Sequence, residues 1–294
     1  MKYEEEFRKY LSEVKGASDN TQNAYISDIK DFSAFCEEKG KAAETAGKAD
    51  VADYVLKLKG ENKSSSTVNR RMSSVRKYCS FLLEKGYSQT DPSSGIRSPK
   101  MSERTVEFLT VDQVNALLDI EGDDPRTARD RALLELLYAT GMRSSEAAAL
   151  NVSDVDLNIG FAICSTGTKS RMIPIGKPAL RALEVYLSGA RDSLCGNDRN
   201  ASALFVNFQG QRITRQGIWK ILKSYGEKAG IETEVSPQLL RNSFAVHMLQ
   251  NGADLRSLQE LMGLEDLNAA KLYLSVTKNR IMDVYDRAHP RATE

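Results

Sequence analysis

The sequence has few of the residues on which metal-binding, disulfide-bonded and membrane proteins depend. It holds only two histidines, and its four cysteines are scattered without the spacing of a metal site. These cysteines are Cys36, Cys79, Cys164 and Cys195. No apolar run approaches the roughly 20 residues that a membrane-spanning helix needs, and the charged start MKYEEEFRKY is unlike a signal peptide. We therefore expect a cytoplasmic protein with reduced thiols, no metal ion and no membrane association.

A strong overall charge of one sign is also missing. The 41 basic and 40 acidic residues give a net charge of +1, which argues against a surface that binds polyanions throughout. The charge is uneven, however, because residues 61–100 hold eight basic side chains against three acidic ones. Such a basic segment on a neutral protein fits either a nucleic-acid contact face or a solvated helix face.

Apolar spacing of three and four residues predicts that both halves of the chain are mostly helical. In the first half, helices are expected over 2–15, 18–39, 49–59 and 64–86. In the second half, they are expected over 127–140, 178–190 and 214–229, with another helix after Arg143. Two short β-like runs, 161–165 and 171–175, flank the turn TGTKS and predict a hairpin. The expected fold class is mainly α with a small antiparallel β-sheet in the C-terminal domain.

A composition change near the end of the first third predicts two domains. Residues 91–108 are rich in proline, serine and charge and show little periodicity, which is typical of a linker. We therefore expect an N-terminal helical domain over 1–90 and a second domain over 109–294. Thr110 and Gln113, in TVDQ, resemble a capping box that would begin the second domain.

The helix expected over 64–86 combines hydroxyl and basic side chains away from its apolar stripe. Hydroxyls and backbone N–H groups at a helix N-terminus suit a phosphate. The candidate DNA contacts here are Ser64, Ser65, Thr67, Arg70, Arg71, Ser74 and Lys77, and the basic helix over 214–229 adds Arg215 and Lys220. An ordinary N-cap with a charged outer face explains the same pattern, so both interpretations stay open.

Residues 236–273 contain the most chemically suggestive pair in the chain. Arg241 stands near the start of an amphipathic helix, and Tyr273 follows a second helical run in an apolar setting. An arginine can hold a phosphate through two parallel charge-assisted hydrogen bonds, and a tyrosine hydroxyl beside that phosphate could attack it. The sequence thus predicts a DNA strand-transfer site.

Several segments, in chain order, resemble the motifs of tyrosine recombinases of the integrase and Xer class. ATGMRSSEAAAL resembles their first arginine box and FAICSTGTKSRMIPIG their β-hairpin. SPQLLRNSFAVHMLQNGADLRSLQELMG is similar to the second arginine box, and KLYLSVT to the segment that bears the nucleophile. SDNTQNAYISDIKDFSAF and STVNRRMSSVRKYCSFLLEKG resemble the N-terminal DNA-clamping helices, and VYDRAHPRA resembles the Xer tail. The resemblance spans nearly the whole chain.

This resemblance implies a two-domain, C-shaped clamp on duplex DNA, with a SAM-like N-terminal domain. It implies attack of a tyrosine on the scissile phosphate, which leaves a 3′-phosphotyrosyl link and a free 5′-hydroxyl and needs no cofactor or metal. It also implies a homo- or hetero-oligomer, a tetramer on paired DNA sites, acting at the nucleoid. A C-terminal helix from about Asn279 would dock on a neighbouring protomer.

Position by position, the resemblance implies that Arg143, Arg241 and Tyr273 are catalytic and that Glu146 supports the first arginine box. Without it, Arg143 closing a salt bridge with Glu146 and Tyr273 serving as a core aromatic beside Leu272 would be the simpler interpretations.

The family's proton-transfer groups are missing from this sequence. The hairpin lysine, a general acid, falls at Thr166, and the histidine that opens the second arginine box falls at Gln238. The histidine after the arginine falls at Asn242, and a later histidine or tryptophan falls at Leu264. Lys169 is a possible substitute acid. Neither histidine replaces a missing group, since His247 is interpreted as a packing residue and His289 belongs to the tail.

Three hypotheses follow. In the first, the protein binds duplex DNA for site-specific recombination or integration, but strand transfer is impaired, because each lost acid or base costs about 10²–10⁴ in rate. In the second, it is a fully active recombinase. In the third, it is a non-catalytic DNA-binding accessory or regulatory paralogue. A helical module that binds a recombinase without DNA is a weaker alternative.

Overall fold

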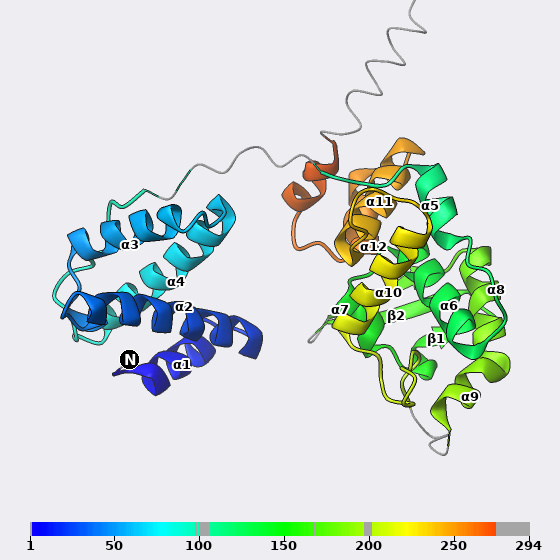
Figure 1. Ribbon diagram of the computed structural model, residues 1–294, viewed down its shortest axis with the longest axis horizontal. Coiled ribbons are helices and arrows are strands. Elements are labelled where there is room, and N and C mark those ends of the chain that lie inside the picture. The colour runs from blue at the N-terminus through cyan, green and yellow to red at the C-terminus, as the bar shows by residue number, and fades with distance from the viewer. Residues whose placement is uncertain (1, 98, 100–105, 167–168, 197–201, 275–294) are drawn as a thin grey trace, which may run out of the picture. The chain divides into compact units, whose positions relative to one another are not determined.

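The computed structural model describes residues 2–97, 99, 106–166, 169–196 and 202–274 (Figure 1). The chain divides into two compact units, Met1–Glu103 and Arg104–Glu294, and the division falls inside the segment that was expected to be a linker. Most described residues are helical, and a single three-stranded antiparallel sheet lies in the second unit. The expected mainly α fold class with a small sheet is confirmed.

The first unit is built from four helices around an aromatic core. They are α1 (Glu4–Glu13), α2 (Asp19–Glu38), α3 (Lys48–Gly60) and α4 (Ser65–Glu84), with a 3₁₀ turn, η1 (Ala43–Thr45), before α3. Ser18 and Ser64 cap α2 and α4 by accepting hydrogen bonds from backbone N–H groups three residues on. The periodic apolar stripes meet in the core, where Phe7, Phe32 and Phe81 are fully buried.

The second unit is larger and contains the remaining elements. They are α5 (Val111–Leu118), α6 (Pro125–Thr140), α7 (Ser144–Ala149), η2 (Val152–Asp154), β1 (Val155–Asp156), β2 (Phe161–Thr166), β3 (Lys169–Pro174), α8 (Lys177–Val185), η3 (Tyr186–Ala190), α9 (Arg191–Cys195), α10 (Arg215–Lys228), α11 (Pro237–Gln250) and α12 (Leu255–Met262). Residues 267–274 are also helical. The capping box of Thr110 and Gln113 forms at the start of α5 as the sequence indicated.

The sheet is a meander in the order β1-β2-β3, and β2 and β3 form the expected hairpin. Its register pairs Cys164 with Arg171 and Thr166 with Lys169. Side chains alternate between the two faces, so Cys164 and Ile173 are buried against the helices, whereas Met172 is exposed. Because Arg171 has the same parity as Ile173, its side chain lies on the inner face of the hairpin.

The contact between α6 and α11 depends on a glycine. Gly141 ends α6 in the left-handed region, with φ of +57°, and a Cβ atom there would lie 2.2 Å from the Phe244 ring. The α6 C-terminus therefore lies directly against α11. This close approach brings the Gly141 carbonyl within hydrogen-bonding distance of Arg241.

Candidate active site

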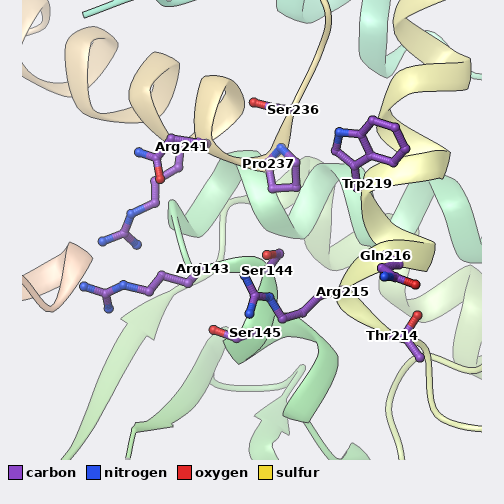
Figure 2. Close-up of a pocket in the computed structure, with 11 residues that line it drawn as sticks. Arg143, Ser144, Ser145, Thr214, Arg215, Gln216, Trp219, Ser236, Pro237 and Arg241 are labelled. Atoms are coloured by element: carbon purple, nitrogen blue, oxygen red, sulfur yellow. The ribbon is translucent and has the colours of Figure 1, made fainter. Parts of the chain in front are cut away.

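A cavity of about 790 Å³ opens between the start of α7, the start of α10 and the start of α11 (Figure 2). It is lined by Arg143, Ser144, Ser145, Thr214, Arg215, Gln216, Trp219, Ser236, Pro237, Gln238 and Arg241. Figure 2 shows the guanidinium groups of Arg143 and Arg241 on the same side of the cavity, with Trp219 and Gln216 opposite. The structure therefore brings together two candidate catalytic arginines from segments about 100 residues apart in the sequence.

Arg241 lies one turn into α11 and is buried. Ser236 caps this helix and Pro237 occupies its first turn, which places Arg241 on the side that faces the end of α6. Its side chain donates to the Gly141 carbonyl and, at 2.7 Å, to the Met262 carbonyl. Burial and the like charge of Arg143 lower the pKa of Arg241 to about 10. An anion in the cavity would relieve both unfavourable effects.

Arg143 stands at the N-cap of α7 and reaches toward the cavity. Its backbone N–H donates to Glu146 Oε2 at 2.7 Å, while its Nη1 lies 3.3 Å from Glu146 Oε1. Its Nη2 donates to the Gly263 carbonyl at 3.1 Å, and 40% of its side chain remains exposed. The salt bridge that the simpler interpretation proposed is present, and it coexists with a guanidinium that lines the cavity.

Arg171, to which the sequence analysis assigned no role in the site, completes the arginine cluster. Its Nη1 and Nη2 donate to the two carboxylate oxygens of Glu146 at 2.7 and 2.8 Å, and its Nε donates to the Leu261 carbonyl at 2.9 Å. The signal was in the strand alternation, since an arginine on the inward face of a hairpin needs a buried anionic partner. Glu146 is that partner, and its side chain is almost fully buried.

The last turn of α12 joins the three arginines. The consecutive carbonyls of Leu261, Met262 and Gly263 accept hydrogen bonds from Arg171, Arg241 and Arg143, respectively. Carbonyl groups at a helix C-terminus lack intrahelical partners and carry partial negative charge, so cations stabilise them. The arginine cluster thereby anchors the loop that leads into the helical segment 267–274.

Tyr273 lies in that segment and is 5% exposed, within an apolar cluster that includes Phe244 and Met262. Its hydroxyl donates to Asn242 Oδ1 at 3.3 Å, and Gln238 Nε2 donates to the same oxygen at 2.8 Å. Burial raises the pKa of Tyr273, although the charges of Arg241 and Arg143 oppose this shift. The side chain thus packs as a core aromatic and also points its hydroxyl toward a residue beside Arg241.

Uncharged side chains occupy the described positions where the family resemblance implies proton-transfer groups. Gln238 and Asn242 form the amide pair at Tyr273, and Leu264 packs against the apolar cluster. Thr166 and Lys169 face each other in the strand register, but their side chains lie outside the described part of the structure. His247 is buried and its Nδ1 is hydrogen-bonded to Tyr138 Oη at 2.9 Å, which agrees with a packing role. His289 lies outside the described residues, as does the helix expected from about Asn279.

On α4, the structure corrects one of the predicted DNA contacts. Ser74 is fully buried, and its hydroxyl donates to Asp28 at 2.7 Å, so the expectation that it lies on an outer face is wrong. The physical reason is that Asp28 sits on the inner face of α2, where a buried carboxylate must be hydrogen-bonded. Arg70 and Arg71 pair with Asp28, and Arg71 also pairs with Asp31 at 2.8 Å.

The remaining predicted DNA contacts lie at or near the surface. Ser64, Ser65 and Thr67 form the start of α4, and Lys77 is partly buried on its fourth turn. Arg215 and Lys220 are exposed on α10, and Arg215 also lines the cavity. In the described ranges, no helix is long and apolar enough to cross a membrane, and no group of three or more metal-binding side chains occurs.

Comparisons with known proteins match both units of the chain. The model of the phage integrase family matches residues 107–280, and that of the phage integrase N-terminal SAM-like domain matches residues 5–86. The tyrosine recombinase XerD of Oceanobacillus iheyensis is 42% identical over 291 residues, which cover 98% of each chain. XerD of Listeria monocytogenes serotype 4b is 39% identical over 292 residues, again covering 98% of each chain.

Solved structures share the fold at lower identity. The XerH site-specific recombinase bound to palindromic difH substrate is 20% identical, with a TM-score of 0.76 over 96% of this chain and 84% of that one. A lambda integrase tetramer bound to a Holliday junction is 17% identical, with a TM-score of 0.71 over 92% and 75% of the two chains.

Proposed function

Because the chain belongs to the phage integrase family of tyrosine recombinases, we propose that it binds duplex DNA for site-specific recombination and that its strand-transfer step is impaired. The observation that carries this proposal is the pairing of Arg143 and Arg241 on one cavity. The two positively charged guanidinium groups are hydrogen-bonded to backbone carbonyl groups, and Arg241 is only 4% exposed. A backbone phosphate of DNA would supply an anion that balances their charge. Relatives whose structures contain DNA support the choice of duplex DNA as the ligand.

The proposed chemistry is an attack of Tyr273 Oη on the phosphorus of the scissile phosphodiester. The bond to the 5′-oxygen breaks as the phosphotyrosyl bond forms, and the reverse step rejoins a 5′-hydroxyl, so no external energy source is needed. Arg143 and Arg241 would stabilise charge on the non-bridging oxygens of the transition state. The attacking tyrosine must give its proton to a base, and the departing 5′-oxygen must receive a proton from an acid.

Impairment is proposed because the observed partner of the tyrosine is an amide. Asn242 Oδ1 accepts a hydrogen bond from Tyr273, but a neutral amide oxygen is too weakly basic to accept the proton itself. Burial also raises the pKa of Tyr273, which reduces the phenolate fraction at neutral pH. Each missing acid or base is worth about 10²–10⁴ in rate.

A specific observation favours each of two alternative functions. A fully active recombinase is favoured by the hydrogen bonds that link Tyr273 through Asn242 to Gln238, which lines the arginine cavity, with Lys169 on the hairpin as substitute acid. A non-catalytic accessory paralogue is favoured by the amide pair. For all three, we propose assembly on paired DNA sites at the nucleoid, with the segment from about Asn279 docking on a neighbouring protomer. The lambda integrase tetramer bound to a Holliday junction supports the oligomeric part of this proposal.

A nicked suicide duplex tests the chemistry. A binding sequence is first selected from a random duplex library and then nicked, so that cleavage releases a short strand and traps the covalent intermediate. We expect a slow adduct that disappears completely in Tyr273→Phe, whereas DNA affinity changes by no more than about tenfold, because removing one exchangeable hydrogen bond costs about 0.5–1.5 kcal/mol. An adduct that persists in Tyr273→Phe would show that another residue is the nucleophile. Rapid adduct formation would favour the fully active alternative, and tight binding with no adduct would favour the accessory paralogue.

Asp28→Asn tests the DNA face of the first unit. The substitution removes the buried counter-charge of Arg70 and Arg71 while keeping a hydrogen-bond acceptor for Ser74. We expect duplex affinity to rise about three- to tenfold and the salt slope to steepen by about 0.9 for each additional phosphate that the two arginines neutralise. Fluorescence anisotropy at several salt concentrations measures both quantities.

Asp53→Asn is the matched control, because Asp53 lies on the same unit and pairs with Lys39 rather than with Arg70 or Arg71. Circular dichroism verifies that each variant is folded. If Asp28→Asn and Asp53→Asn leave affinity and salt slope equally unchanged, Arg70 and Arg71 do not face DNA.

A further inference from the structure

The structure assigns Arg171 as a positioning residue: by binding both oxygens of Glu146, it leaves the Arg143 guanidinium available to an anion in the cavity. This inference rests on the proposed phosphate site, which Arg171 itself does not line. The negative charge of the Glu146 carboxylate lies among the positive charges of Arg143, Arg171 and Arg241.

The distances show how the carboxylate is shared. Arg171 makes a bidentate pair with Glu146, with both nitrogen–oxygen distances below 3 Å, whereas Arg143 reaches a single oxygen at 3.3 Å. Bidentate guanidinium–carboxylate pairs are the strong form of this interaction. Glu146 is therefore bound mainly to Arg171, although it is only three residues from Arg143 in the sequence.

The exposed fractions of the Arg171 and Arg143 side chains show the same difference. The Arg171 side chain is 16% exposed and that of Arg143 is 40% exposed. Arg171 is further held by the Leu261 carbonyl, and a Cβ atom at Gly263 would lie 2.8 Å from its Nη1. Arg171 is thus fixed between β3 and the end of α12, whereas Arg143 lines the cavity.

Removal of the Arg171 charge has a definite consequence. The buried Glu146 carboxylate would then have Arg143 as its nearest cation, and a bidentate pair between them would draw the guanidinium away from the cavity. The net charge of the cluster formed by Arg143, Arg171, Arg241 and Glu146 would fall from +2 to +1. Anion binding weakens for both reasons.

Inorganic sulfate probes the site without DNA. Thermal unfolding of the full chain is followed in sulfate and in chloride at matched ionic strength, and an apparent sulfate affinity is obtained from the concentration dependence. Sulfate also stabilises proteins non-specifically, so the response that remains in Arg143→Ala is subtracted. We expect Arg171→Gln to weaken the site-specific sulfate affinity about tenfold, as loss of one nearby unit charge would.

Rescue distinguishes this role from a merely structural one. The double variant Arg171→Gln/Glu146→Gln restores the net charge and removes the competitor for Arg143, so its sulfate affinity should return to within about threefold of wild type. Arg131→Gln is the matched control, because Arg131 also binds backbone carbonyl groups and loses the same charge elsewhere. It should leave the site-specific affinity unchanged.

Each outcome decides the inference. It is overturned if the double variant binds sulfate no better than Arg171→Gln, or if Arg171→Gln binds like wild type. Should Arg171→Gln fail to fold, Arg171→Lys keeps the charge but not the bidentate pair, so its sulfate affinity should fall by more than about threefold; wild-type affinity there would also overturn it. A wild-type protein with no site-specific sulfate response would instead contradict the proposed phosphate site itself.

Discussion

Introducing two of the proton-transfer groups that the family resemblance implies, through Thr166→Lys and Gln238→His, is expected to raise the rate of covalent adduct formation by about 10²–10⁴-fold. Lysine at position 166 would supply a general acid for the departing 5′-oxygen. Histidine at position 238 would replace an amide that is linked to the Tyr273 hydroxyl through Asn242. The two substitutions should not multiply fully, because groups that act on one transition state are not additive.

The double variant is measured on the nicked suicide duplex in single-turnover experiments, beside each single substitution. Its rate should also become pH-dependent near the ordinary histidine pKa of about 6.5, a dependence that Gln238 cannot produce. Adding Tyr273→Phe to the double variant is the control and should abolish the adduct. An unchanged rate in the double variant would mean that proton transfer is not what limits the wild-type protein.

Arg241→Met is expected to reduce adduct formation below detection and to eliminate the site-specific response to sulfate, while changing stability much less. It removes the buried guanidinium that would contact the phosphate, and Arg143 alone cannot hold both non-bridging oxygens in the proposed geometry. Loss of one positioned charged donor costs about 10²–10³ in rate. If strand transfer is impaired as proposed, this loss adds to that impairment.

Stability should change little because two effects oppose each other. The Gly141 and Met262 carbonyls lose their donor, which costs about 1–3 kcal/mol for each buried group. Against this, burial and the like charge of Arg143 lower the pKa of Arg241 to about 10, so together they disfavour its charged form by roughly 3 kcal/mol. This penalty is fully present at neutral pH and absent with methionine.

Denaturant unfolding and the suicide-substrate assay measure the two effects separately. Arg131→Met is the control for loss of a carbonyl-bound arginine outside the site. A variant that unfolds at room temperature, or one that keeps wild-type sulfate binding, would contradict the assignment of Arg241.

The spacing of motifs predicted some residues of the candidate site and missed another. Arg241 and Tyr273 were predicted as site residues from their chemistry, and the family resemblance added Arg143, because these residues stand at fixed positions relative to helix starts and turns. Arg171 was not found, although its parity with Ile173 on the hairpin was readable. Parity says which face of a strand a side chain is on, but not which of several carboxylates it meets there. That pairing depends on β3 lying against α7 and α12.

On α4, the prediction from the sequence placed a buried side chain on an outer face. Ser74 and Arg70 were assigned to a single outer face from the spacing of the apolar residues on their own helix. Asp28, on a neighbouring helix, decides the matter, because a buried carboxylate requires donors from wherever they are within reach. A single helix cannot reveal a polar contact that its neighbour imposes.

The family, the mainly helical fold class and the hairpin could all be predicted from the sequence alone. These features follow from local periodicity and from the identity of residues at fixed intervals. Packing in three dimensions was needed to show that two arginines share one carboxylate unequally and that the nucleophile candidate is hydrogen-bonded to Asn242. Both depend on distances between segments far apart in the chain, and such distances are set by packing rather than by spacing.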